Sequence, residues 1–158
     1  MDAAELEQTL NAISSHAVVC HGYTNNMRDY EIVVRDPADL SAEKEPPHRR
    51  YVFRYCIGAL CFPTVSPETW KQSLHDSWIS QEGQDSDAAP EESAGSVAWL
   101  RFPCAEVPPP SKLARRWSEA LGIKFHDVFL RTSIYRLHLL FSELQVTEVR
   151  PDTSLPRS

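Results

Sequence analysis

The apolar and polar positions of this chain follow helical spacing in some segments and strict alternation in others, which predicts both helices and strands. Near the N-terminus, one apolar stripe at helical spacing consists of Leu6, Leu10 and Ile13. Residues 16–23 then have a strand pattern, and residues 27–35 have the pattern of its returning partner. Between them, Asn25 and Asn26 tolerate left-handed backbone angles, so we predict a two-residue hairpin turn at this pair.

The longest alternating pattern covers residues 49–62. Its apolar positions are Tyr51, Phe53, Tyr55, Ile57, Ala59 and Cys61. A period of two over this length predicts one long strand with its apolar face on the core. Gly58 interrupts no part of that period, and we predict a β-bulge there.

Two further segments carry helix signals. Ser66 and Pro67 form a typical helix start, because a hydroxyl side chain caps the first turn and proline fits the first helical position. The stripe that follows consists of Trp70, Leu74 and Trp78. Ser111 and Gly122 likewise predict the two ends of a helix. Its stripe consists of Leu113, Trp117 and Leu121.

Strand patterns return at residues 96–102 and again towards the C-terminus. One face of the clearest late strand consists of Tyr135, Leu137, Leu139 and Phe141. Short turns between successive strands favour antiparallel pairing. We therefore predict the α+β class and a single domain over residues 1–149, with a mainly antiparallel sheet of about six strands and three amphipathic helices on one face. Residues 150–158 are predicted to be a disordered tail.

Composition places the chain among ordinary globular proteins, since 42% of its residues are hydrophobic and 24% are charged. No apolar run approaches the roughly 20 residues of a membrane span. The acidic, amphipathic N-terminus resembles neither a signal peptide nor a transit peptide. We expect a cytoplasmic protein without membrane contact. Because cytosolic disulfides are rare, four reduced thiols are expected. They are Cys20, Cys56, Cys61 and Cys104.

The negative charge of the chain is concentrated in one segment. The net charge is −6, and it becomes −1 without five acids between residues 82 and 92. These acids are Glu82, Asp85, Asp87, Glu91 and Glu92. We expect an acidic flexible loop at about residues 81–95 that solubilises the chain or steers a basic protein partner. The acidic balance disfavours nucleic acid as a partner.

The predicted hairpin contains the residue types best suited to catalysis. With a two-residue turn, Tyr23 lies opposite Arg28 and His21 lies opposite Tyr30, which predicts a stacked Arg28–Tyr23 pair and an edge-on His21–Tyr30 pair. Asp29 then points to the other face of the sheet. A general-base pair of His21 and Asp29 needs hydrogen-bond contact, and this register forbids it.

A longer hairpin loop leaves a second interpretation open. In it, a small hydrolase or metal-dependent enzyme uses His21, Arg28, Asp29 and Glu31. Two carboxylates two positions apart suit a hard cation, but they are too few without further ligands. We expect no metal and no other cofactor.

The remaining polar groups do not form a recognisable catalytic set. Cys56 and Cys61 are an odd number of positions apart, so on one strand they face opposite sides and are expected to be buried apolar thiols. His126 and Asp127 are neighbours that point apart, and His138 is expected to be exposed. None has a nucleophile in a recognisable turn, and a glycine-rich phosphate loop is absent from the sequence. A basic patch on the predicted late helix, expected to be its solvated face, consists of Lys112, Arg115 and Arg116.

Three stretches, at residues 21–34, 49–76 and 117–149, carry a family resemblance. In the order of these stretches and in their residues, the chain from about His16 to Val149 resembles the YxiG-like domain family of small bacterial proteins. The resemblance implies no catalytic residues, because the family has none established. Its namesake belongs to a gene neighbourhood downstream of a large secreted polymorphic toxin, which implies an immunity or accessory role by association.

At one strand the chain departs from the family pattern. Family members carry charged residues where this chain has Gly58 and Leu60. Leu60 and Phe62 therefore form either an exposed apolar contact patch or a surface that another element covers.

The sequence thus favours a non-enzymatic protein-binding module, of the immunity or accessory type in a bacterial toxin or conflict system. Its partner is expected to be a protein, such as a basic toxin domain. The expected contact residues are Tyr23, Arg28, Leu60, Phe62 and the five acids of residues 82–92.

Overall fold

The computed structural model describes the chain in six stretches, namely residues 1–12, 16–35, 48–64, 67, 104–132 and 135–150. Four predicted features lie outside these residues. They are the body of the helix that starts at Ser66, the strand at residues 96–102, the acidic loop, and nearly all of the tail. The described helices are α1 (Ala3–Asn11) and α3 (Lys112–Leu121).

The described strands form two four-stranded antiparallel sheets. The first sheet has the order β1 (Ala17–Thr24), β2 (Asp29–Arg35), β3 (His48–Arg54), β8 (Glu143–Val149). The second has the order β4 (Gly58–Pro63), β7 (Tyr135–Phe141), β6 (His126–Arg131), β5 (Cys104–Glu106). The predicted α+β class is confirmed. The single sheet of about six strands is wrong, because the described residues form eight strands in two sheets. Two of the three predicted helices are described, and the body of the third lies outside the described residues.

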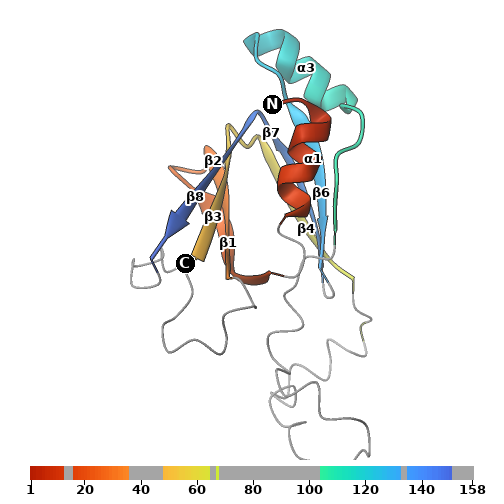
Figure 1. Cartoon of the computed structure of the whole chain (residues 1–158). Coiled ribbons are helices and arrows are strands. Elements are labelled where there is room, and N and C mark those ends of the chain that lie inside the picture. The colour runs from red at the N-terminus through yellow and green to blue at the C-terminus, as the bar shows by residue number, and fades with distance from the viewer. Residues whose placement is uncertain (13–15, 36–47, 65–66, 68–103, 133–134, 151–158) are drawn as a thin grey trace, which may run out of the picture.

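The core lies between the two sheets. Phe53 of the first sheet and Phe141 of the second meet edge to face, with ring centroids 4.8 Å apart. From α1, Leu6 and Leu10 enter the same cluster, as their spacing predicted. Figure 1 shows α1 beside the strands and α3 across one end of the two sheets. One buried cluster therefore joins both sheets and α1.

The predicted long strand at residues 49–62 is wrong, because the chain turns a corner in its middle. Tyr55 has a φ of 52°, so β3 ends at Arg54 and β4 continues in the other sheet. The partner strands β7 and β8 turn at the same place, where Ser142 N donates to Arg54 O at 3.1 Å. On the other side of the corner, Ile57 N donates to Leu140 O at 2.9 Å. The alternation of apolar residues in the sequence continues through such a corner, because β3 before it remains paired with β8 and β4 after it remains paired with β7.

The ends of α3 are where the sequence places them. Ser111 Oγ accepts a hydrogen bond from Ala114 N at 3.1 Å, and Gly122 ends the helix with a φ of 67°. Its packing differs from the prediction. The stripe of Leu113, Trp117 and Leu121 is exposed, and the buried residue of this helix is Ala114. The small alanine allows α3 to approach the sheet, and the larger apolar side chains remain in contact with solvent.

We predict that the core between the sheets dominates stability. Leu139 is fully buried, whereas Leu60 on the neighbouring strand is 54% exposed. Leu139→Ala should lower the free energy of unfolding by about 2–5 kcal/mol, because it leaves a cavity. Leu60→Ala, the matched control, should change it by less than about 0.5 kcal/mol. Urea unfolding of the two variants checks this, and equal losses would contradict the assignment of the core.

Candidate functional site

The β1–β2 hairpin has a four-residue turn rather than the predicted two-residue turn. Its last ladder pair is Thr24 and Asp29, and Asn25, Asn26 and Met27 all have positive φ between 51° and 62°. The two asparagines therefore adopt the left-handed conformation that their sequence predicted. The pairing shifts by two residues, so that Tyr23 lies opposite Tyr30 and His21 lies opposite Ile32, and a shift of two keeps the two faces of the hairpin as predicted.

His21 is part of an aromatic cluster on the inner face of this hairpin. Its Nδ1 shares a hydrogen bond of 2.6 Å with the Tyr30 hydroxyl, and its ring centroid lies 5.2 Å from that of Tyr135. Burial lowers the pKa of His21 and raises the pKa of both tyrosines. The imidazole is therefore held neutral between two neutral phenols. The predicted contact of His21 with Tyr30 is confirmed, but the predicted edge-on geometry is wrong, because the rings are tilted by 35° and the residue opposite His21 is Ile32.

Asp29 holds the turn against the corner between β3 and β4. Its buried carboxylate accepts hydrogen bonds from Tyr55 N at 2.9 Å and from Asn25 Nδ2 at 2.8 Å. Burial by itself would raise the pKa of Asp29. These two hydrogen bonds and the nearby charges of Arg28 and Arg54 outweigh burial, and the pKa lies below its ordinary value.

The shorter turn predicted that Arg28 stacks on Tyr23, and this prediction is wrong. Its guanidinium lies over the ring of Tyr55, 5.5 Å from the centroid, and its Nε is 3.6 Å from Asp29 Oδ1. Arg54 lies at 5.4 Å from the centroid of the same ring. Tyr23 instead meets Tyr30 edge to face, with centroids 5.2 Å apart. The longer turn carries Arg28 past the end of the ladder, which explains the change of partner.

Glu31 is paired with Arg50 of the next strand. Arg50 Nε donates to Glu31 Oε2 at 2.7 Å, and the carboxylate is buried. Strand alternation places Glu31 on the face opposite to His21. The four hairpin residues considered for an enzyme therefore do not converge, because His21, Asp29 and Glu31 each serve a separate contact.

A groove of about 370 Å³ lies between the hairpin turn and α3. Its lining residues are Tyr23, Met27, Arg28, Tyr55, Cys56, Ile57, Trp117, Leu121 and Phe125. Two of the predicted contact residues, Tyr23 and Arg28, border it. Sequence reasoning did not include Met27, Trp117 and Leu121, which are 70%, 39% and 53% exposed. The helical spacing of Trp117 and Leu121 is visible in the sequence, but such a stripe predicts burial in the core rather than an exposed contact surface.

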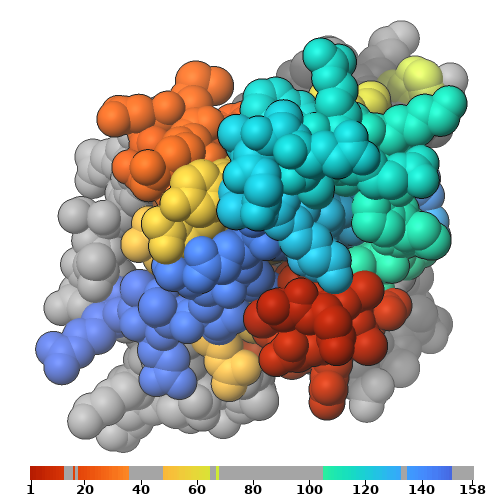
Figure 2. All heavy atoms as spheres, turned by 90° about the horizontal axis from the view of Figure 1, so that it is seen from above, coloured from red at the N-terminus to blue at the C-terminus, as the bar shows by residue number. Residues whose placement is uncertain are grey.

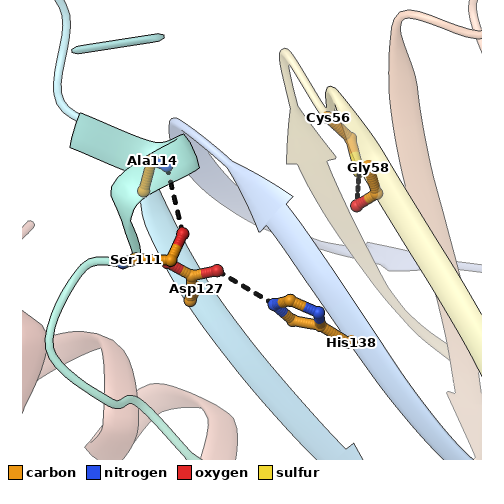
Figure 3. Close-up of polar contacts among 6 residues, drawn as sticks. All are labelled: Cys56, Gly58, Ser111, Ala114, Asp127 and His138. Atoms are coloured by element: carbon orange, nitrogen blue, oxygen red, sulfur yellow. Dashed lines mark hydrogen bonds and ion pairs between the residues drawn. The ribbon is translucent and has the colours of Figure 1, made fainter. Parts of the chain in front are cut away.

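Polar contacts hold α3 in place beside the groove. Asp127, buried on β6, accepts a hydrogen bond from Ser111 N at 2.8 Å through one oxygen and lies 2.9 Å from His138 Nε2 through the other. Figure 3 shows this pair beneath the first turn of α3. At the other end of the helix, Phe125 N donates to Ser118 Oγ at 2.9 Å. The predicted exposure of His138 is wrong, since this ring pairs with Asp127 and stacks on Phe129 at 4.4 Å.

The two apolar residues predicted to contact a partner, Leu60 and Phe62, lie on another surface. Leu60 and Phe62 are 54% and 53% exposed on β4, an edge strand. Strand alternation places them opposite to Ala59, which packs against the core. They therefore form an exposed patch separate from the groove. The five predicted acidic contact residues lie outside the described part of the chain.

Of the two cysteines predicted to be buried, Cys56 is buried and Cys61 is not. Cys56 is buried at the corner, its Sγ donates to Gly58 O at 3.3 Å (Figure 3), and burial raises its pKa to about 11. Cys61 is exposed, so the expectation of two buried thiols is wrong for this residue. Cys20, Cys56 and Cys61 are all free thiols.

The described residues form neither a cluster suited to a metal ion nor a helix suited to a membrane. Among these residues, no group of three or more His, Cys, Asp or Glu side chains is placed to hold a metal ion. No helix in the same stretches has the length and apolar character needed to cross a membrane.

A family model described as YxiG-like protein matches residues 2–157, which is nearly the whole chain. No curated protein matches it. Among solved structures, the chain is similar to an uncharacterised protein from Neisseria gonorrhoeae, with 7% sequence identity and a TM-score of 0.42. That similarity covers 86% of this chain and 93% of the other.

We predict that Asp29 stabilises the protein only while it is ionised. Asp29→Asn should lower the free energy of unfolding by about 1–3 kcal/mol at neutral pH, since it weakens charge-assisted hydrogen bonds to a buried group. A folded-state pKa below the ordinary 3.8 means that this contribution is complete above about pH 5 and is lost as pH falls through the folded-state value.

Denaturant unfolding of wild type and variant between neutral and acidic pH measures this difference. The gap between their free energies of unfolding should begin to narrow at about pH 5 and should close as pH falls through the folded-state pKa, which lies below 3.8. Glu119→Gln, at an exposed position of α3, serves as the control, and its effect on the free energy of unfolding should be small and independent of pH. A gap that stays constant down to the acid limit would show that the charge of Asp29 is unimportant.

Proposed function

We propose that this chain, which belongs to the YxiG-like protein family, is a non-enzymatic protein-binding module that docks its partner at the groove between the β1–β2 turn and α3. One observation carries the proposal. Met27, Trp117 and Leu121 stand exposed around a single concave surface. Contiguous exposed apolar side chains of this kind are typical of interaction sites.

The residue types around the groove favour a protein partner. Tryptophan, tyrosine, methionine and arginine are enriched in protein interfaces, and Trp117, Tyr55, Met27 and Arg28 all border this groove. A small ligand is typically enclosed over most of its surface, whereas Met27 and Leu121 are more than half exposed here. An open apolar surface is therefore better suited to the broad contact of a protein than to a small ligand.

The walls of the groove are held firmly enough to present these side chains. Asp29 fixes the turn to the corner at Tyr55, and Asp127 fixes the first turn of α3. Preorganised walls reduce the conformational entropy lost on binding. These firmly held walls support a docking role for the groove, whose exposed apolar side chains are not part of the core.

The narrower proposal is an immunity-type or accessory role in a bacterial toxin or conflict system, in the cytoplasm. It is supported by the gene neighbourhood that the family resemblance implies. Co-expression with a toxin domain encoded beside the gene tests it, because an immunity protein should restore growth. Wild-type protein that restores growth no better than an empty vector would count against this role.

We predict that partner capture depends on the groove rather than on the β4 patch. Affinity-tagged wild-type protein should retain a partner from host extract. Leu121→Ala should retain about five- to thirtyfold less of it, since a central apolar contact is worth about 1–2 kcal/mol. Leu60→Ala is the matched control, because Leu60 and Leu121 are 54% and 53% exposed. Quantitative mass spectrometry of the captured proteins measures both ratios.

The control also separates the two predicted contact surfaces. Loss of the partner in Leu60→Ala with full retention in Leu121→Ala would move the contact to the β4 patch and contradict the groove. Retention in both variants would contradict both surfaces. Unchanged thermal unfolding of each variant excludes misfolding as the cause.

The acidic residues between 82 and 92 generate a separate prediction about association rate. Neutral substitution of all five should slow association with a basic partner, because attraction between opposite charges raises encounter rates. Most of the difference should vanish near 1 M salt, where the screening length falls to about 3 Å. The free energy of unfolding should stay within about 0.5 kcal/mol of wild type. Stopped-flow binding at two ionic strengths decides this, and an unchanged rate at low salt would mean that the acids only solubilise the chain.

A further inference from the structure

We propose that a second pocket, at the start of α1, binds a small carboxylate whose apolar body is about one ring in size. Lys124 would pair with the carboxylate, His126 would hydrogen-bond to it, and three prolines after β5 would contact the ring. This pocket shares no lining residue with the groove between the β1–β2 turn and α3, so the site goes beyond the proposed function.

The pocket has a volume of about 220 Å³ and lies where three segments of the chain meet. In Figure 2 the red N-terminal residues lie beside both the green segment that follows β5 and the cyan segment that leads into β6. Asn11 Oδ1 of α1 accepts a hydrogen bond from Ala105 N of β5 at 3.0 Å, which fixes two of these segments to one another. The lining residues are Ala3, Val107, Pro108, Pro109, Pro110, Lys124 and His126.

His126 is the observation that carries the proposal. It is only 5% exposed, on the face of β6 that enters the core with Val128, and its ring centroid lies 6.3 Å from that of Phe141. Its ring has no hydrogen-bond partner among the described residues, although neither ring nitrogen is fully enclosed. Buried polar side chains usually have a partner. His126 therefore presents an unused hydrogen-bonding group to the pocket.

The charge of the pocket favours an anion. Lys124 and His126 are the two polar side chains of its lining, and no ion pair involves Lys124 within the described part of the chain. Burial, and then the nearby charge of Lys124, lower the pKa of His126, so its imidazole is neutral at neutral pH. One cation beside one neutral N–H donor matches a single carboxylate, which accepts charge-assisted hydrogen bonds.

The other walls of the pocket favour an apolar body on that carboxylate. The three prolines at residues 108–110 have no backbone N–H, so this wall offers carbon surface and no donor. Proline rings pack well against aromatic rings, as in the recognition of proline-rich segments. A cavity of roughly 150 Å³ holds benzene. The larger volume here leaves room for benzene with a carboxylate attached, whereas drug-sized ligands occupy about 300–1,000 Å³.

Other occupants fit these residues less well. A metal ion needs three or four ligands, and Lys124 repels a cation next to His126. Inorganic phosphate would leave the proline wall uncovered. A neutral aromatic molecule would leave the charge of Lys124 without a partner. Asp2 is within electrostatic range of Lys124, but its carboxylate already accepts the N–H of Glu5 and caps α1.

Titration of the full chain with four small molecules, followed by NMR, tests the proposal. Benzoate is the probe, benzamide is its neutral analogue, benzylamine is a cation of similar shape, and acetate lacks the ring. The ring resonances of His126 report on the pocket. Those of His138 are the control, because this ring pairs with Asp127 on the opposite face of the sheet.

Benzoate should saturate the protein below about 10 mM and bind at least about tenfold more tightly than the other three molecules. It should shift the His126 resonances, leave those of His138 in place, and raise the pKa of His126, because a bound anion stabilises the imidazolium. The other charges that act on His126 are Lys124 and the amino terminus, which lower its pKa, and Asp127, which raises it.

Lys124→Met should weaken benzoate binding at least about tenfold, since it removes the cation and keeps the apolar stem. Arg136→Met removes an exposed cation from β7 and should leave benzoate binding unchanged. Leu121→Ala, which alters the groove, should also leave it unchanged. Thermal unfolding of each variant confirms that it is folded.

The proposal fails if benzoate does not saturate, if benzamide binds equally well, or if Lys124→Met binds benzoate as wild type does. Benzoate binding that leaves the His126 resonances in place would put the ligand elsewhere. A tripeptide that ends in phenylalanine and binds more tightly than benzoate would make the C-terminus of a protein the source of the carboxylate and contradict a small free acid. None of these results affects the capture experiment that tests the groove.

Discussion

The buried carboxylate of Asp29 is the interaction on which the groove depends. It joins two backbone segments that are distant in sequence, because it accepts hydrogen bonds from Asn25 in the turn and from Tyr55 N at the corner. Beside it, Cys56 N donates to Arg28 O at 2.8 Å. The hairpin turn and the corner are therefore fixed to one another. Since the corner is also where the chain passes from one sheet to the other, the same contact links the groove to the whole fold.

The other wall of the groove has an unusual energetic basis. A helix of ten residues is marginal by itself and usually gains stability by burying its largest apolar side chains. In α3, Ala114 is buried, while capping by Ser111 and the contact of Ser111 N with Asp127 hold the helix in place. Trp117 and Leu121 remain exposed, and apolar surface in water costs about 25 cal/mol per Å². A partner that covers these side chains recovers that free energy, which gives the groove an intrinsic tendency to bind apolar groups.

The hairpin shows why residue types alone did not identify a site. His21, Asp29 and Glu31 are the kinds of residue that catalyse reactions, and they are close in sequence. In the structure each has a separate partner, namely Tyr30, Tyr55 N and Arg50. Each of these contacts satisfies a buried polar group that would otherwise destabilise the fold. Their polar character is therefore explained by the demands of burial, and the surface nearby offers apolar contacts instead.

Local signals were sufficient for the class of the fold, for the two ends of α3 and for the left-handed residues of the hairpin turn. The cap at Ser111, the left-handed Gly122 and the left-handed Asn25 and Asn26 all occur where their sequences predicted, because these preferences act over a few residues. The corner at Tyr55 and the division into two sheets escaped prediction, since alternation continues through a corner when the partner strand bends with it. The exposure of Trp117 and Leu121 escaped prediction for a related reason. A helical stripe specifies which side chains share a face, but the elements packed against the helix determine whether that face is buried. Among the described residues, the face of α3 that is buried is that of Ala114, which packs with Phe125 and Leu140.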